Sequence, residues 1–274
     1  MTRLFGVMGH PITHSLSPAM HTAALRALKL DAVYAPFDVP PDLLAPILRG
    51  LAASGVEGLN VTVPLKEAVI PFMGRLDRSA KAIGAVNTIV VRGGRLTGYN
   101  TDAAGFLRAL RELGWRPRPT RAVILGAGGA ARAAAWALAR RGGRLTIANR
   151  HLDRARALVR WLRRVAPRAC AEAIPRSRVR LQDAELLVNA TTVGMRPSDG
   201  SPVDPRRLHR GLLVYDLVYH RETALVRAAR RRGCVAAGGL SMLLYQGAES
   251  LRLWLHQSPP IEVMRRALRE ALET

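Results

Sequence analysis

Short apolar runs alternate along this chain with segments whose apolar positions recur at helical spacing. Such alternation is typical of a mostly parallel sheet covered by helices on both faces. In the first part of the chain, strands are predicted at residues 4–9, 32–39 and 56–63, and helices at 17–29, 42–54 and 77–83. Residues 86–91 and 95–99 predict a hairpin that turns at Gly93 and Gly94.

A second alternating series follows a predicted helix at 103–113. Gly114, Pro117 and Pro119 interrupt the pattern, so we expect a domain boundary near residues 101–120. Strands are then predicted at 121–125, 145–149, 186–190 and 212–217, and helices at 151–165 and 223–232. After Gly239 the pattern is helical to the end, broken only at residues 259–260. Two helices without a strand between them cannot extend the second sheet, so we expect them to pack back on the first domain.

The second series opens with a pattern typical of dinucleotide-binding folds of the Rossmann type. A buried strand runs into Gly126-x-Gly128-x-x-Ala131 and then into an alanine-rich helix. The first glycine permits a tight turn, the second lets the backbone approach a pyrophosphate, and the alanine allows close helix–strand packing. The pyrophosphate would sit on the helix N-terminus. The predicted contacts are Gly126, Ala127, Gly128, Gly129 and Ala130.

The tip of the next predicted strand indicates which dinucleotide binds. NAD-preferring sites usually end this strand with a carboxylate, whereas here Asn149 and Arg150 stand there, with Arg154 one helical turn further on. A carboxylate would repel a 2′-phosphate and two guanidiniums would clamp it, so the pattern predicts NADP(H). The competing interpretation is that these are simply two of the chain's 39 arginines.

The predicted fold class is therefore α/β with two domains. Residues 1–101, joined by about 240–274, would form an N-terminal α/β domain with a mostly parallel sheet. Residues 102–239 would form the Rossmann-type NADP domain, with the C-terminal helices packed back on the first domain.

The charge of the chain is unevenly distributed. The formal net charge is +22 over 274 residues, and residues 104–236 alone carry +19. A phosphate-rich small ligand, a nucleic acid, or a surface without function would each be compatible with this excess. Aromatic residues make up only 5% of the chain, which argues against base stacking and hence against nucleic acid.

Other features of the composition bear on the compartment. Two cysteines make no disulfide framework, the N-terminus lacks the apolar core of a signal peptide, and no apolar run reaches a membrane span. We expect a soluble cytoplasmic protein with no membrane partner and no bound metal.

Lys66 is the candidate for proton chemistry. Only three residues of the chain are lysine, and an amine can lose a proton near neutral pH where a guanidinium cannot. Four polar segments of the first domain, at 14–17, 60–62, 84–88 and 100–102, fall at predicted strand ends or helix starts. Loops at the carboxyl ends of parallel strands can converge on one ligand. Each segment alone has a plain alternative as a cap or turn.

These segments, taken in order, resemble the bacterial shikimate dehydrogenase family nearly end to end. The motifs that carry the resemblance are Gly9-His10-Pro11-Ile12, His14-Ser15-Leu16-Ser17-Pro18, Met20-His21, Asn60-Val61-Thr62-Val63-Pro64 with Lys66, Gly84-Ala85-Val86-Asn87-Thr88, Gly98 with Asn100-Thr101-Asp102 and Gly105, the glycine loop, Asn149-Arg150, Asn189-Ala190-Thr191 with Gly194-Met195, Asp216-Leu217-Val218-Tyr219, and Met242 with Gln246.

The resemblance implies reversible, NADPH-dependent reduction of 3-dehydroshikimate to shikimate in aromatic amino-acid biosynthesis. Lys66 and Asp102 would be catalytic and flank the reacting oxygen. The implied substrate contacts are Ser15, Ser17 and Tyr219 at the carboxylate, Thr62, Asn87, Asp102 and Gln246 at the ring hydroxyls, and Asn60 with its motif. Leu217 and Gly239 would line the nicotinamide, and Thr191 is a further cofactor candidate.

Three questions stay open at this stage. A quinate/shikimate dehydrogenase of broader specificity is the alternative function. Lys66 is either the proton donor or a group that only positions substrate. His151 stands where the family commonly has threonine or serine, which leaves the detail of adenine-ribose binding undefined. We expect a monomer or a homodimer.

Overall fold

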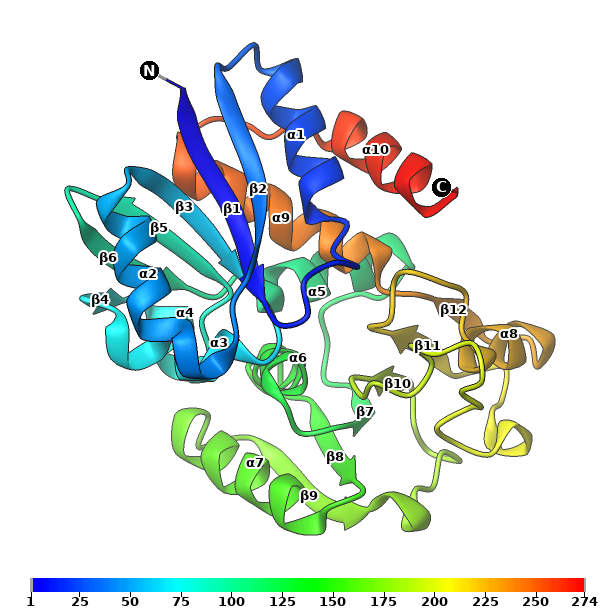
Figure 1. Ribbon diagram of the computed structural model, residues 1–274. Coiled ribbons are helices and arrows are strands. Elements are labelled where there is room, and N and C mark those ends of the chain that lie inside the picture. Colours follow the sequence, from blue (N-terminus) through cyan, green and yellow to red (C-terminus); the bar gives the residue numbers. More distant parts are fainter. Residues whose placement is uncertain (1, 274) are drawn as a thin grey trace. The chain divides into compact units, whose positions relative to one another are not determined.

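The computed structural model describes residues 2–273 (Figure 1). The chain divides into two compact units, Met1–Gly105 with Leu243–Thr274, and Phe106–Met242. The two boundaries fall inside helices α5 (Asp102–Glu112) and α9 (Leu240–Leu255). Each unit contains one six-stranded sheet, and each is described by itself below.

The sheet of the first unit has the strand order β2-β1-β3-β5-β6-β4. Its strands are β1 (Arg3–Gly9), β2 (Ala32–Asp38), β3 (Val56–Val61), β4 (Arg75–Leu76), β5 (Thr88–Arg92) and β6 (Arg95–Tyr99). The β1–β2, β1–β3 and β4–β6 pairs are parallel, whereas β5 pairs antiparallel with β3 and β6. The sheet is thus parallel from β2 to β3, antiparallel through the predicted hairpin of β5 and β6, and ends at β4, which runs parallel to β6.

Helices cover both faces of this sheet (Figure 1). On one face α2 (Leu44–Ala53), α3 (Leu65–Ala68) and α4 (Arg78–Ile83) bury Leu48, Leu65 and Ala80 against β3 and β5. On the other face α9 places Trp254 on Phe5, with 5.3 Å between the ring centroids. Helices α1 (Ser17–Ala27) and α10 (Ile261–Glu273) pack against each other. Both C-terminal helices therefore complete the first unit.

The sheet of the second unit is entirely parallel, in the order β12-β11-β10-β7-β8-β9. Its strands are β7 (Arg121–Leu125), β8 (Arg144–Asn149), β9 (Cys170–Pro175), β10 (Leu186–Asn189), β11 (Leu213–Asp216) and β12 (Val235–Ala237). From β7 the chain adds two strands on one side and then three on the other. The order reverses between β7 and β10, which is where open α/β sheets bind ligands.

Three helices of the second unit connect its parallel strands: α6 (Gly129–Ala139), α7 (Leu152–Val165) and α8 (Ala224–Arg231). Helix α6 is alanine-rich, and its fully buried alanines let it lie close to the sheet. Helix α7 buries Leu158 and Leu162 and turns its arginines outward. Within residues 2–273, no helix is both long and apolar enough to cross a membrane.

The α/β fold class and nearly all the predicted elements are confirmed, with ends that shift by a few residues. Among the α-helices and β-strands of residues 2–273, four lie outside the predictions: α3, β4, β9 and β12. Helix α3 has four residues and β4 two, too few for a periodic pattern. Strands β9 and β12 are the edges of their sheet and are only partly buried, so their sequences lack the apolar run of a central strand.

Candidate active site

Lys66 lies in the short helix α3 (Leu65–Ala68), which follows β3 after a turn at residues 62–64, and its amine faces a carboxylate. Leu65 is fully buried, whereas the next residue, Lys66, is only partly buried. Lys66 Nζ donates to Asp102 Oδ2 at 2.6 Å. The Lys66 side chain is 15% exposed and that of Asp102 4%, so the pair is shielded while the amine keeps a path to solvent.

Asn87 determines which way the Asp102 carboxylate faces. The backbone N–H of Thr101 donates to Asn87 Oδ1 at 2.7 Å, and because a backbone N–H can only donate, this contact settles the amide's orientation. Asn87 Nδ2 then donates to Asp102 Oδ1 at 2.8 Å and to Gln246 Oε1 at 3.1 Å. One carboxylate oxygen is thereby occupied and the other is left for Lys66. Four predicted residues are thus joined by direct hydrogen bonds: Lys66, Asn87, Asp102 and Gln246.

A second layer of buried polar groups supports Asn87 from behind. Thr88 Oγ1 donates to Asn87 Oδ1 at 3.1 Å and lies 2.7 Å from Ser250 Oγ of α9. Asn60 Nδ2 donates to Ser250 Oγ at 2.9 Å, and Tyr34 Oη donates to Asn60 Oδ1 at 2.8 Å. We call these five residues, with Thr101, the buried network. It ties together β2, β3, β5 and α9, since its members come from all four elements.

The buried network has an energetic consequence for the site. A buried hydrogen-bonding group that loses its partner costs about 1–3 kcal/mol, and an uncompensated buried charge costs more. The Asp102 carboxylate and the Asn87 amide therefore have one favourable arrangement. The site is held in place by side chains of the protein itself.

Three further predicted substrate residues, Ser15, Ser17 and Thr62, lie in the same unit and have other partners than Lys66 and Asp102. Ser15 Oγ accepts from the backbone N–H of Ser17 at 3.3 Å, in the first turn of α1. Burial raises the pKa of Tyr34 well above its usual value, and a hydrogen bond with Ser17 opposes the rise. Thr62 follows β3, and its N–H donates to Met8 O at 2.9 Å. Ser17 is therefore joined to the buried network through Tyr34.

His21 lies beside this network on α1 and is fully buried. Its ring stacks on Tyr34 with 4.4 Å between the centroids, and neither ring nitrogen has a hydrogen-bond partner among the described residues. Burial lowers the pKa of His21 to about 3, so the ring is neutral at physiological pH.

The glycine loop of the second unit has the shape that a pyrophosphate needs. Gly126 has φ +107°, and a Cβ there would lie 2.7 Å from Ala190 O, so both conformation and space require glycine. Gly128 precedes α6, and a Cβ there would meet nothing within 4 Å. That open space over the first turn of a helix is what a bound phosphate would fill. Ala127, Gly129 and Ala130 are partly buried around it.

The predicted 2′-phosphate residues lie together after β8. Asn149 is partly buried, and its Nδ2 donates to His151 O at 3.0 Å. Arg150 and Arg154 are exposed. Arg150 Nε donates to His151 Nε2 at 3.3 Å. The strand tip thus presents two guanidiniums to solvent, which suits a dianionic group.

The remaining cofactor candidates lie at the ends of β10 and β11. Thr191 Oγ1 donates to Asn189 Oδ1 at 2.7 Å, and Asn189 Nδ2 donates to the buried Asp216 at 2.9 Å. Burial raises the pKa of Asp216. A Cβ at Gly239 would strike the backbone oxygen of Leu217, so these two segments need glycine to approach each other. Neither Asn189 nor Asp216 is among the predicted cofactor contacts, although both belong to motifs that carry the family resemblance.

Tyr219 follows β11 and is partly buried, which raises its pKa. Its ring meets His220 edge-on at 5.9 Å. No group of histidine, cysteine, aspartate or glutamate within residues 2–273 is arranged to hold a metal ion.

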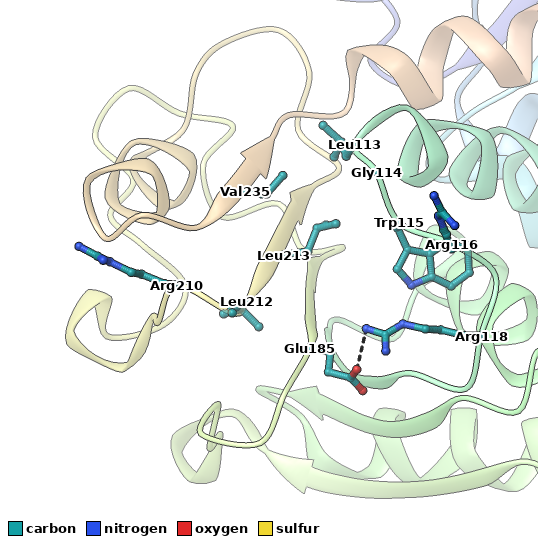
Figure 2. A pocket seen from close by; sticks show the side chains of 11 residues that line it. Leu113, Gly114, Trp115, Arg116, Arg118, Glu185, Arg210, Leu212, Leu213 and Val235 are labelled. Carbon is teal, nitrogen blue, oxygen red and sulfur yellow. Dashed lines mark ion pairs between the residues drawn. The ribbon is translucent and has the colours of Figure 1, made fainter.

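A cavity of about 370 Å³ in the second unit is a different feature (Figure 2). It is bordered by Trp115 and Arg118 before β7, by Glu185 before β10, and by Leu212 and Val235 at β11 and β12. Arg118 and Glu185 form an ion pair of 2.8 Å at its edge. These residues mark the amino ends of the strands, whereas the glycine loop lies at the carboxyl ends. The cavity therefore includes none of the predicted cofactor residues.

Three family models match successive parts of the chain. Residues 7–89 match the shikimate dehydrogenase substrate binding domain, and residues 109–196 match the shikimate/quinate 5-dehydrogenase model. Residues 239–269 match the shikimate 5′-dehydrogenase C-terminal domain. Together they span both units and the C-terminal helices.

Individual relatives agree over the full length. The chain is 48% identical to the NADP⁺ shikimate dehydrogenase of Methanopyrus kandleri, covering 99% of this chain and 96% of that protein. It is 49% identical to that of Moorella thermoacetica, covering 99% and 94%. The crystal structure of shikimate 5-dehydrogenase from Thermus thermophilus with NADP(H) and shikimate superposes with a TM-score of 0.89 at 40% identity, covering 98% of this chain and 100% of that one.

Proposed function

We propose that Lys66 and Asp102 form the acid–base pair of an NADP-dependent shikimate dehydrogenase, the family to which this chain belongs. The chain is an oxidoreductase of the shikimate pathway that interconverts 3-dehydroshikimate and shikimate. The observation that carries the acid–base assignment is the 2.6 Å contact between Lys66 Nζ and an Asp102 carboxylate whose other oxygen is held by Asn87.

The cofactor is NADP(H), as predicted. When bound, it supplies or accepts the hydride of the reaction. The open space at Gly128 over the N-terminus of α6 and the exposed guanidiniums after β8 fit its pyrophosphate and its 2′-phosphate. We assign the pyrophosphate to residues 126–130 and the 2′-phosphate to Arg150 and Arg154, and we keep Asn149, Thr191, Leu217 and Gly239 as further contacts.

Lys66 is proposed to move the proton. As an ammonium it carries three N–H donors, of which Asp102 takes one, so another can point at the carbonyl oxygen of the substrate. It donates a proton to that oxygen during reduction, and its neutral amine recovers the proton from the hydroxyl in the reverse direction. Asp102 keeps the amine in place and accepts from a neighbouring ring hydroxyl. General acid–base catalysis of this kind contributes about 10²–10⁴ in rate.

The remaining polar groups are proposed to hold the substrate. Asn87, Gln246 and Thr62 would contact ring hydroxyls, and Ser15, Ser17 and Tyr219 the carboxylate. Asn60 is 4% exposed and bonds to Tyr34 and Ser250, so we assign it a positioning role through the buried network.

The test of this function compares two substrate pairs. Purified protein should reduce NADP⁺ with shikimate at a kcat/KM at least about 100-fold higher than it reduces NAD⁺ with quinate, a ratio set by the hydroxyl and phosphate contacts. Comparable values for both pairs would instead favour the broader quinate/shikimate enzyme. We propose the cytoplasm, where a biosynthetic enzyme draws on NADPH, and a monomer or homodimer.

A further inference from the structure

The side chain of His151 does not cap the helix that it precedes. It is the residue before α7, a position where serine or threonine would cap the helix, but its side chain makes no capping bond. Its ring instead meets Arg150, whose Nε donates to His151 Nε2 at 3.3 Å. Nε2 is thus the acceptor of this contact.

The charged surroundings of this ring are mostly positive. Arg150 stands at the strand tip, and Arg154 lies in the first turn of α7. The nearby carboxylate, Asp153, pairs with Arg156 at 3.4 Å. On the neighbouring strand β9, Pro175 is in register with Asn149, and Arg176 follows it. On helix α6, Arg132 lies over Trp161 of α7, 4.8 Å from the centroid. The carboxylate of Glu172 on β9 accepts from Thr146 Oγ1 of β8 at 2.8 Å, so Glu172 and Asp153 both have partners. A dianion bound here would bring a new negative charge beside the imidazole.

We propose that His151 is a proton-dependent ligand of the 2′-phosphate of NADP(H), an inference that rests on the proposed cofactor site. On binding, the ring takes up one proton at Nε2, gives up its bond from Arg150, and donates from Nε2 to a phosphate oxygen. Arg150 Nε is released to donate to the same phosphate. A threonine in this place donates a hydrogen bond but cannot gain a charge.

The sign of the pH dependence follows from the proton uptake. The bound phosphate favours the charged ring, so the affinity for NADP(H) rises as the pH falls towards the range in which a free histidine is itself protonated. The affinity for a nucleotide without a 2′-phosphate does not rise in this way as the pH falls. The chain would hence bind NADP more selectively, relative to NAD, at pH 6 than at pH 8.

The test measures binding by calorimetry, without turnover. The probes are 2′,5′-ADP and 5′-ADP, and the proteins are wild type, His151→Gln, and Arg160→Gln as a control that removes one exposed charge from the same helix. For 2′,5′-ADP, the Kd of His151→Gln divided by that of wild type should be about 2 at pH 8 and about 10 at pH 6. The phosphate's own titration occurs in both proteins and cancels in this ratio. For 5′-ADP the ratio should stay near 1.

Proton uptake gives a second readout. Titrations in two buffers with different ionisation enthalpies should show that wild type takes up part of a proton on binding 2′,5′-ADP at pH 7, and that His151→Gln takes up less. A ratio that is the same at both pH values, or uptake equal in the two proteins, would overturn the inference. If wild type bound 2′,5′-ADP no better than 5′-ADP, the proposed cofactor site would be wrong as well. If wild type reduces NADP⁺ with shikimate but the Kd ratio is the same at pH 8 and pH 6, only the role of His151 is wrong.

Discussion

The candidate site of the first unit consists of buried side chains, whereas that of the second consists of backbone N–H groups and exposed arginines. In the first unit, Lys66 and Asp102 are side chains held by other side chains, through Asn87 and the buried network. In the second unit, the candidate site consists of a glycine loop at a helix N-terminus and of exposed guanidiniums at Arg150 and Arg154. One site is fixed by buried hydrogen bonds before any ligand arrives, whereas the other offers backbone dipoles and exposed positive charge.

The difference matches what each site must do. Proton transfer needs atoms held to within a few tenths of an ångström, and buried, mutually satisfied polar groups provide that order. Holding a phosphate needs charge and N–H groups that tolerate small shifts. Substitutions in the first unit should therefore lower kcat, and those in the second should weaken cofactor binding.

The largest effect is expected from Lys66→Ala. It removes the proposed proton donor and leaves Asp102, 4% exposed, without its cation. Steady-state kinetics with shikimate and NADP⁺ should show kcat lower by about 10²–10⁴, with KM changed by less than about fivefold. Lys81→Ala, an exposed lysine on α4, is the matched control and should behave as wild type. A change confined to KM would reduce Lys66 to a binding role.

Arg150→Gln should have a smaller and different effect. It removes one of the two charges assigned to the 2′-phosphate, so the Kd of NADPH should rise by about 10–100-fold while that of NADH stays the same. Fluorescence titration of the two reduced cofactors measures both values. Equal weakening of NADPH and NADH would mean that Arg150 does not contact the 2′-phosphate.

His21 should make the first unit sensitive to acid. Its pKa is about 3 when folded and about 6.5 when unfolded, so the unfolded chain binds the extra proton and stability falls as the pH drops from about 6.5 to about 3. Between pH 7 and pH 5 wild type should lose about 2 kcal/mol more than His21→Leu does. Urea unfolding at the two pH values gives both numbers; parallel losses would contradict a buried neutral His21.

Tyr34→Phe should give the smallest effect, since it removes only one hydroxyl of the buried network. The lost bond to Asn60 Oδ1 should lower the free energy of unfolding by about 1 kcal/mol and raise the KM for shikimate a few-fold through Ser17. Tyr99→Phe, on the hairpin strand β6, serves as the comparison. A kcat loss as large as that of Lys66→Ala would show that the network is needed for the chemical step itself.

Local sequence was enough to nominate the candidate residues of the second unit, because those residues are neighbours along the chain. The glycine loop and Asn149-Arg150 each occupy one short segment, and the structure places them at strand ends as expected. The family resemblance supplied the pairing of Lys66 with Asp102, which are 36 residues apart.

The buried network could not be predicted in the same way. Asn60 and Ser250 are 190 residues apart, and their bond depends on how α9 lies on the sheet. A serine in the middle of a helix is weak evidence from sequence, because most such hydroxyls bond to their own helix or to water. Tyr34 lies within a predicted strand, and nothing in the sequence around it indicates a hydrogen bond to Asn60. Tertiary packing gave these residues their role.

Chemical rescue of Lys66→Ala tests the central claim most directly. Methylammonium, formed from added methylamine, and tetramethylammonium can both replace the positive charge of Lys66. Only methylammonium has an N–H proton to donate. If Lys66 moves the proton, methylamine should restore kcat by about tenfold or more, with a rate that follows the fraction of amine in the required protonation state, and tetramethylammonium should not. Equal restoration by both cations would contradict the account, because charge alone would then replace Lys66.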